Sequence, residues 1–192
     1  MLLIVGTCAA FLLSRYARRA FLIIEVAGES MAPTLRPGEF LVVRRGLPRD
    51  IAGRIVYVEG ELGRPLVKRV VGLPGESLRV GDHVEVNGRA LVEHYTHGPA
   101  PTPSYRGVNR LGPGEYFVLG DNRAASTDSR QFGPIRQDAI EGAVWLRYWP
   151  PGRIGMVDRV PRRFASRPAP TVEAVPEPPV PLHHDERFGT TS

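Results

Sequence analysis

The chain has 192 residues, of which 42% are hydrophobic and 23% charged, and its formal net charge is +5 at pH 7. These values fit one globular domain with a well-buried core plus a tail or small insert, and they exclude a chain of several large domains. Cys8 is the only cysteine, which excludes an internal disulfide and a multi-cysteine zinc site. The sequence contains no zinc-finger or RNA-binding motif, so we expect no nucleic-acid partner and assign the basic excess to an anionic membrane surface.

The first predicted element is the apolar segment Met1–Leu13, which ends before a basic cluster of Arg15, Arg18 and Arg19. A helix of this length spans about 20 Å, which is short of the roughly 30 Å hydrocarbon core of a bilayer. The alternatives are a buried helix or a cleaved signal peptide, but a basic start and a clear small-residue cleavage site are absent. We expect an N-terminal membrane anchor over residues 1–20, although arginines that follow such a segment normally stay cytoplasmic.

After this segment the sequence predicts many short strands and little helix. The predicted strands are β-branched or aromatic runs bounded by Gly or Pro: Phe21–Ala27, Glu39–Arg44, Arg54–Glu59, Leu66–Gly72, Leu78–Val80, His83–Val86, Arg89–Val92, Tyr116–Leu119 and Ala143–Tyr148. Asn87-Gly88 between two of them predicts a two-residue hairpin. We therefore expect a mostly antiparallel β domain over residues 21–150, with a small appended β-region at about 81–113. The Pro-rich residues 151–192 are expected to form a disordered tail.

Lys68 is the only lysine of the chain, and every other basic residue is an arginine. A genomic preference for arginine codons explains the bias but not this exception. In a strand over Leu66–Gly72, Lys68 shares a face with Leu66 and Val70. Such a lysine usually extends its amine to solvent. If the amine is buried instead, its pKa falls and the neutral form can act as a general base, which an arginine cannot do.

Two polar segments carry candidate hydroxyl groups. Ser30 follows a predicted strand in a turn with Gly and Pro, which can expose its hydroxyl and its backbone N–H together, as half of an oxyanion hole; alone, it could be an ordinary turn residue. The segment Gly120–Arg130 offers Ser126 to orient an amine. In the same segment Asp128 and Arg130 can pair and brace the loop. The alternative is a polar loop with Asx-type turns.

The histidines form no comparable group of candidate functional residues. His94 and His97 could share a metal, and His183 and His184 are adjacent near the C-terminus. Neither pair has the rest of a ligand set, so we expect no metal and no other cofactor.

Three motifs resemble the type I signal peptidases, which are serine proteases with a Ser-Lys dyad. The first is Ser-Met-Ala-Pro-Thr-Leu from Ser30, and the second is Lys-Arg-Val-Val-Gly-Leu-Pro-Gly-Glu from Lys68. The third is Gly-Glu-Tyr-Phe-Val-Leu-Gly-Asp-Asn-Arg from Gly114, continued by Ser-Thr-Asp-Ser-Arg from Ser126. They follow the order that the family uses, and the resemblance covers about Phe21–Pro150. It implies antiparallel β-sheets of the signal-peptidase type behind an N-terminal anchor helix.

The resemblance implies a role for each matching residue. Ser30 would be the nucleophile and its backbone N–H an oxyanion donor, while Lys68 would be the general base. Ser126 would hydrogen-bond the Lys68 amine, and Met31 would line the substrate cleft. Three charged residues would keep the third motif against the site: Arg69, Asp128 and Arg130.

The chain departs from the family's pattern at three places. Many members carry Ser or Thr at the position of Gly28, where the hydroxyl completes the oxyanion hole, so only backbone donors are assured here. Ala124 and Ala125 replace acidic or amide residues. The short apolar segment leaves the membrane topology open.

The function implied by the resemblance is removal of signal peptides from exported preproteins, with cleavage after a small residue and a second small residue two positions earlier. The enzyme would be a monomer held in membrane lipid by a single pass, with its catalytic domain outside the cytoplasmic membrane. The alternatives are a maturation protease with one dedicated client, a self-cleaving repressor domain, and a non-catalytic binding module on the same scaffold.

Overall fold

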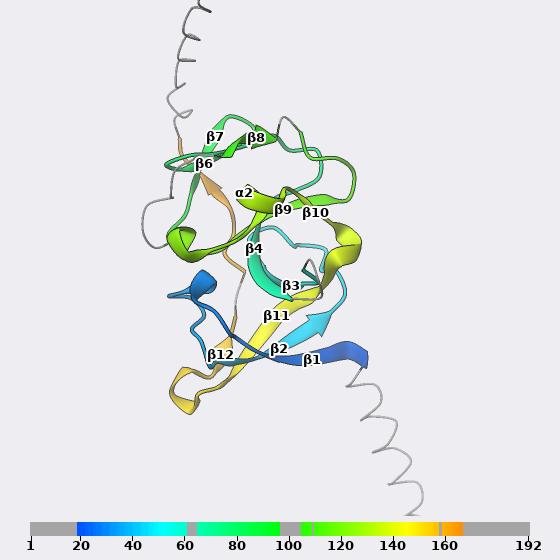
Figure 1. Ribbon diagram of the computed structural model, residues 1–192, viewed down its shortest axis with the longest axis vertical. Coiled ribbons are helices and arrows are strands. Elements are labelled where there is room, and N and C mark those ends of the chain that lie inside the picture. The colour runs from blue at the N-terminus through cyan, green and yellow to red at the C-terminus, as the bar shows by residue number, and fades with distance from the viewer. Residues whose placement is uncertain (1–18, 61–64, 97–104, 109, 158, 167–192) are drawn as a thin grey trace, which may run out of the picture.

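The computed structural model describes residues 19–60, 65–96, 105–108, 110–157 and 159–166, and these form two antiparallel β-sheets (Figure 1). The prediction of a mostly antiparallel β fold is therefore confirmed. Across these ranges no helix has the length and apolar character needed to cross a bilayer. The expected anchor segment, Met1–Leu13, lies outside the described residues.

The larger sheet has eight strands in the order β1-β2-β11-β3-β4-β9-β10, with β12 paired to β11. Its strands are β1 (Phe21–Glu25), β2 (Phe40–Arg45), β3 (Ile55–Val58), β4 (Leu66–Gly72), β9 (Glu115–Leu119), β10 (Ile135–Arg136), β11 (Ile140–Trp149) and β12 (Gly155–Met156). All its pairings are antiparallel, and several of them join strands that are far apart in the sequence, such as β2 with β11 and β4 with β9.

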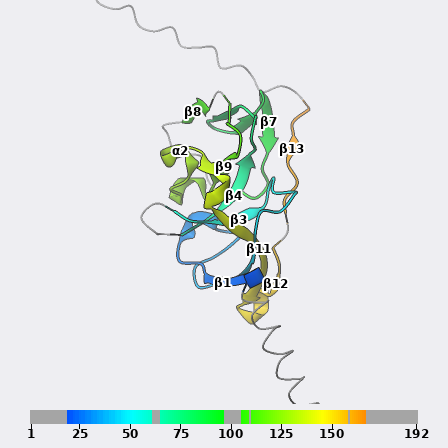
Figure 2. The same ribbon diagram turned by 90° about the vertical axis from the view of Figure 1, so that its right-hand side faces the viewer.

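The smaller sheet has five strands in the order β13-β7-β6-β5-β8 and is drawn above the larger sheet in Figures 1 and 2. Its strands are β5 (Leu78–Val80), β6 (Val84–Val86), β7 (Arg89–Val92), β8 (Tyr105–Val108) and β13 (Arg163–Phe164). Asn87 and Gly88 both have positive φ, 52° and 74°, as a tight hairpin turn requires, so that prediction is confirmed. The smaller sheet begins at Leu78 rather than near residue 81, and it recruits a strand from far along the chain.

Short helical turns also connect strands in the described part of the chain: η1 (Glu29–Met31), η3 (Arg123–Ala125), α2 (Ser129–Phe132), η4 (Gln137–Ala139) and η5 (Pro151–Arg153). The first of them contains Ser30, and η3 and α2 flank Ser126. Asp128 caps α2 through a capping box with Gln131, so it fixes the end of this polar loop.

Strands β4 and β9 separate two hydrophobic clusters, because their alternate side chains point to opposite faces. Val71 and Phe117 pack toward the smaller sheet, whereas Val70 and Val118 pack against β3 and β11. Both faces of β4 are therefore covered, and Lys68 on one face and Arg69 on the other are both buried.

The prediction of a disordered tail from residue 151 is wrong for its first part. β12 and β13 lie in this stretch, and Arg162 donates to both oxygens of Glu76 at 2.6 and 2.8 Å and to the Val71 carbonyl at 3.0 Å. β12 pairs with the preceding strand β11, whereas β13 and Arg162 are held by residues far earlier in the chain. None of these contacts leaves a periodic pattern in the sequence. The rest of the expected tail, residues 167–192, lies outside the described residues.

Two truncations isolate the contribution of residues 161–166. A chain that ends after Val160 loses β13 and the Arg162–Glu76 pair, whereas a chain that ends after Ser166 keeps both. We expect the shorter chain to be less stable by about 1–3 kcal/mol, because the Glu76 carboxylate loses a bidentate partner. Thermal unfolding of the two chains checks this, and equal midpoints would contradict it.

Candidate active site

Ser30 lies in the turn between β1 and β2, and buried side chains on its C-terminal side fix this turn. Met31 and Leu35 are 1% and 0% exposed and belong to the hydrophobic cluster under β1 and β2. The Ser30 carbonyl accepts a hydrogen bond from the Asn122 N–H at 3.0 Å. The first motif is thus held by the core below it and by the third motif beside it.

Lys68 lies on β4 with 3% of its surface exposed, and its amine reaches the serine. The Nζ donates to Ser30 Oγ at 2.8 Å and to the Val67 carbonyl at 3.1 Å. Burial lowers the pKa of Lys68 from 10.5 to about 8, against the opposing charges of Asp128 and Asp121. About a tenth of such amines are neutral at pH 7, compared with one in a few thousand for an unperturbed lysine.

A cleft of about 480 Å³ opens beside these two groups, between the end of β1 and the start of β4. Apart from Glu25 and the Ser30–Lys68 pair, its lining is apolar or aromatic or comes from glycine. The remaining lining residues are Ile24, Val26, Ala27, Gly28, Met31, Tyr57, Pro65, Leu66 and Val67. Among the described strands, β1 pairs with β2 alone. β9 pairs with β4 only from Arg69 onward, so the first part of β4 has no partner on that side. Both strands therefore face the cleft with an unpaired edge, which is the geometry that accepts an extended peptide.

Asp128 organises the third motif. Its carboxylate accepts hydrogen bonds from the Gly120 N–H at 2.9 Å and from the Ser126 hydroxyl at 2.7 Å, and it forms a bidentate pair with Arg130. Burial by itself raises the pKa of Asp128, but the hydrogen bonds from Arg130, Gly120 and Ser126 bring it below its ordinary value. This carboxylate is therefore ionised at neutral pH, and Asp128 and Arg130 brace the loop as expected.

The expected hydrogen bond between Ser126 and the Lys68 amine is not among the contacts of these two residues. The Ser126 hydroxyl instead donates to the ionised carboxylate of Asp128, which makes this a charge-assisted hydrogen bond. Ser126 is 7% exposed and packs directly against Gly120.

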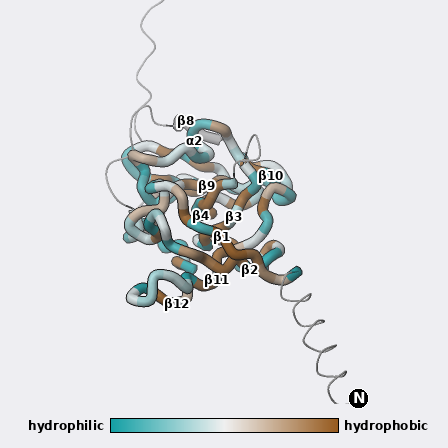
Figure 3. Tube along the Cα trace, turned by 60° about the horizontal axis from the view of Figure 1, so that its bottom comes forward, coloured by the Kyte–Doolittle hydropathy of each residue, from teal (hydrophilic) through white to brown (hydrophobic). Residues whose placement is uncertain are grey.

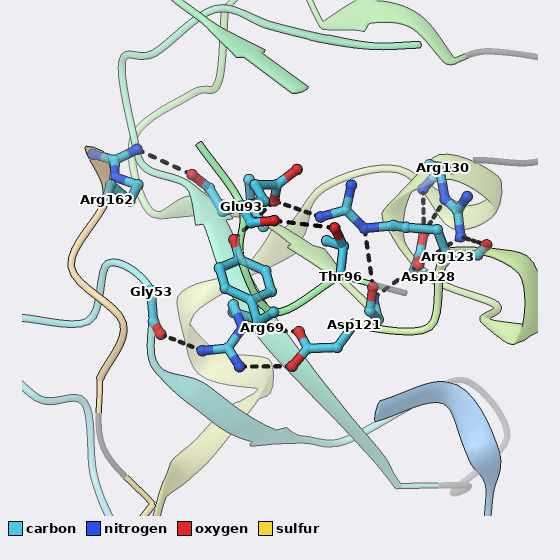
Figure 4. Close-up of polar contacts among 12 residues, drawn as sticks. Gly53, Arg69, Glu93, Thr96, Asp121, Arg123, Asp128, Arg130 and Arg162 are labelled. Atoms are coloured by element: carbon cyan, nitrogen blue, oxygen red, sulfur yellow. Dashed lines mark hydrogen bonds and ion pairs between the residues drawn. The ribbon is translucent and has the colours of Figure 1, made fainter. Parts of the chain in front are cut away.

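Arg69 links the second motif to the third through a residue that the sequence analysis did not single out. Its Nε and Nη2 donate to the two oxygens of Asp121 at 2.8 and 2.6 Å, and its Nη1 donates to the Gly53 carbonyl at 2.8 Å (Figure 4). Asp121 also accepts the Thr34 hydroxyl at 2.6 Å. One carboxylate therefore joins all three motifs. The sequence signal that could have identified Asp121 is its position in Gly-Asp-Asn-Arg, directly after a predicted strand.

Two further arginines hold the segment after Ser30. Arg147 Nη1 and Arg153 Nη2 donate to the Thr34 carbonyl at 3.1 and 3.2 Å. The buried Glu39 carboxylate lies between the two guanidinium groups, at 3.4 and 2.8 Å. No sequence pattern pointed to these contacts, because they join residues more than 100 positions apart.

Gly120 lies where no side chain fits. A Cβ added there would lie 2.2 Å from Ser126 Oγ and 2.5 Å from the Ser30 carbonyl oxygen. The glycine therefore allows the third motif to pack directly onto the backbone of Ser30.

Among the described residues no group of three or more His, Cys, Asp or Glu side chains is arranged to hold a metal ion. His94 is described, whereas His97, His183 and His184 lie outside the described residues.

Comparison with known proteins gives consistent matches. The family model described as signal peptidase, peptidase S26, matches residues 1–149. Signal peptidase I of Bacillus caldolyticus is 35% identical over 164 residues, which cover 77% of this chain and 85% of that protein. Signal peptidase I V of Bacillus subtilis (strain 168) is 34% identical over 156 residues, which cover 72% and 92%. A crystal structure of a signal peptidase I from Enterococcus faecalis V583 aligns with a TM-score of 0.45 and 29% identity, over 51% of this chain and 98% of that one.

The close packing at Gly120 gives a prediction. Gly120→Ala should lower the free energy of unfolding by about 1–3 kcal/mol, because a methyl group overfills the contact with Ser126 and the Ser30 backbone. Gly155→Ala is the matched control, since an added Cβ there meets nothing within 4 Å. Urea unfolding of the two variants measures the difference. Equal stability of both would show that Ser30 and Ser126 can separate without cost.

Proposed function

This chain belongs to the peptidase S26 family of signal peptidases and so is a serine endopeptidase, and we propose that it cleaves signal peptides with Ser30 as nucleophile and Lys68 as general base. The observation that carries the proposal is the 2.8 Å contact between Lys68 Nζ and Ser30 Oγ, made by an amine whose pKa is lowered to about 8. A general base works best when its pKa lies near the working pH.

In the proposed reaction, neutral Lys68 takes the proton of the Ser30 hydroxyl as its oxygen attacks the carbonyl carbon of the scissile bond. The Ser30 N–H, which makes no hydrogen bond to another described residue, is available to the oxyanion. The tetrahedral intermediate collapses when the ammonium of Lys68 gives its proton to the leaving amine. Water then attacks the resulting ester, again with Lys68 as the proton acceptor. The Lys68 ammonium returns this proton to Ser30 Oγ as the acyl–oxygen bond breaks, which releases the carboxylic acid product and regenerates Ser30.

The cleft supports an extended stretch of the preprotein as substrate. A peptide that pairs with the free edges of β1 and β4 points every second side chain toward the same wall. The residue before the cleaved bond and the one two positions earlier would therefore face the buried Met31 and its apolar neighbours. This agrees with a preference for small residues at both positions.

The proposed membrane attachment has support from one end of the larger sheet. Large apolar side chains are exposed there on β1, on β11 and after it: Ile23, Trp145, Tyr148, Trp149, Ile154 and Met156. Figure 3 shows that the chain is hydrophobic along β1 and β2 in this region. Aromatic side chains favour the interface between lipid and water. We propose that this surface lies on the outer face of the cytoplasmic membrane, that residues 1–20 anchor the chain, and that the enzyme acts as a monomer.

Two substitutions at Lys68 test the proposed base. Lys68→Arg keeps the positive charge but cannot release its proton, and Lys68→Met keeps the approximate shape without an amine. We expect both to lower kcat for a synthetic precursor peptide by at least about a thousandfold, as Ser30→Ala should. Thermal unfolding provides the control for folding. Substantial cleavage by folded Lys68→Arg would rule out the dyad, and failure of the wild-type protein to cleave any precursor would favour a non-catalytic module.

The pH dependence of cleavage gives an independent test. Because burial lowers the pKa of Lys68 to about 8, the neutral amine forms as the pH rises through this value, and kcat/KM should rise with it and level off above. A histidine base would place the rise near pH 6.5. The measurement is a profile from pH 5 to 10 with a soluble peptide. A rise centred near 6.5 would contradict the assignment of Lys68.

A further inference from the structure

The segment directly after β7, in the smaller sheet, reaches into the neighbourhood of the active site. Glu93 Oε1 accepts hydrogen bonds from Arg123 Nη2 and from the Tyr95 hydroxyl, the latter at 2.8 Å (Figure 4). The Glu93 and Arg123 side chains are only 7% and 5% exposed. The pair is therefore a buried contact between the segment that follows β7 and the loop of the third motif, where Arg123 begins η3.

Arg123 transmits this contact to the loop that lies against Ser30. Its Nε donates to the Gly120 carbonyl at 3.1 Å, and its own carbonyl accepts from Arg130 at 2.8 Å. Gly120 packs against the Ser30 carbonyl, and the Asn122 N–H donates to that same oxygen. A continuous path of contacts therefore runs from Glu93 to the backbone of the nucleophile.

Tyr95 makes the corresponding contact with the strand that carries the base. Its ring lies under the Arg69 guanidinium, with 4.1 Å between the guanidinium carbon and the ring centroid, and Arg69 follows Lys68 directly on β4. Burial and the nearby Glu93 carboxylate raise the pKa of Tyr95, so its hydroxyl stays protonated and remains a donor to Glu93. Glu93 and Tyr95 thus contact the loop of the third motif and the strand of the second at the same time.

The charges of this network balance. Three arginines and three carboxylates, with side chains no more than 7% exposed, pair one to one: Arg69 with Asp121, Arg123 with Glu93, and Arg130 with Asp128. Loss of the Glu93 charge leaves Arg123 as a buried cation without its carboxylate, which is strongly unfavourable. The loop would then move to hydrate Arg123, and the contact at Ser30 would move with it.

We propose that Glu93 and Tyr95 are positioning residues for peptide cleavage, which hold residues 120–130 against β4 and so set the distance between Ser30 and Lys68. This inference rests on the proposed dyad. It gives the smaller sheet a part in the reaction, since the sheet supplies two groups that keep the two catalytic elements in register.

The test compares three variants of the full chain on a soluble precursor peptide, well below their thermal midpoints. Glu93→Gln should lower kcat roughly tenfold or more with KM within about twofold, because misplacement of the reacting groups affects the chemical step more than binding. Tyr95→Phe should lower kcat severalfold. Glu85→Gln is the control in the same sheet, since its partners are the more exposed Arg79 and His83, and it should leave kcat unchanged.

A double variant separates positioning from general loss of stability. In an Arg123→Gln background no buried cation needs Glu93, so Glu93→Gln should have little further effect on kcat. An equal loss of kcat in both backgrounds would overturn the proposal, as would a Glu93→Gln enzyme with wild-type kcat. If Glu93→Gln does not fold, Tyr95→Phe becomes the test, and an unchanged kcat in that variant would overturn the proposal. Failure of the dyad itself shows separately, as cleavage that survives Ser30→Ala in the otherwise wild-type chain.

Discussion

The buried ion pair between Arg69 and Asp121 is the constraint on which the arrangement of the site depends. The two side chains are 1% and 0% exposed, so neither can recover its lost hydration from solvent. Hydrogen bonds within the protein replace this hydration. Asp121 accepts two hydrogen bonds from Arg69 and one from Thr34, and Arg69 also donates to the Gly53 carbonyl. Such a pair adds little net stability compared with an apolar core, but it tolerates only one relative position of the three motifs.

Lys68 and Arg69 are adjacent on one strand, yet their surroundings give them opposite electrostatic roles. Arg69 has a carboxylate at hydrogen-bonding distance and a guanidinium that cannot lose its proton. Among the described residues Lys68 has a hydroxyl and a carbonyl at that distance, and it interacts with the Asp121 and Asp128 carboxylates through space. Burial therefore outweighs attraction at Lys68, and the pKa falls to about 8. The direction of each side chain from β4, not the sequence composition, produces this difference.

Local sequence signals predicted the strands well and the long-range contacts poorly. The bounds of β4, β5 and β7 agree with the prediction, because Gly, Pro or charged residues end each run. β10, β12 and β13 are only two residues long, which is too short for any periodicity to show, and β13 in addition pairs with a strand far earlier in the chain. Asp121 and Glu93 were missed because their partners lie 52 and 30 residues away. The resemblance pointed to Ser126, but it did not indicate that its hydroxyl donates to the Asp128 carboxylate two positions later.

The charge balance of the network bears on the chemistry of the proposed dyad. Each buried arginine of the network is paired with its own carboxylate, whereas Lys68, which contacts Ser30, has its pKa lowered by burial to about 8. In the proposed reaction, proton transfer from Ser30 would create an ammonium on Lys68 and an oxyanion on the substrate, so the net charge of the site would stay the same while the charges separate. The through-space attraction of Asp128 and Asp121 then stabilises the ammonium as it forms. Preorganised charges of this kind stabilise a transition state without reorganisation during the reaction. In the proposed mechanism the fixed ion pairs would therefore have two roles: they hold the geometry of the site, and they supply the electric field in which the proton moves between Ser30 and Lys68.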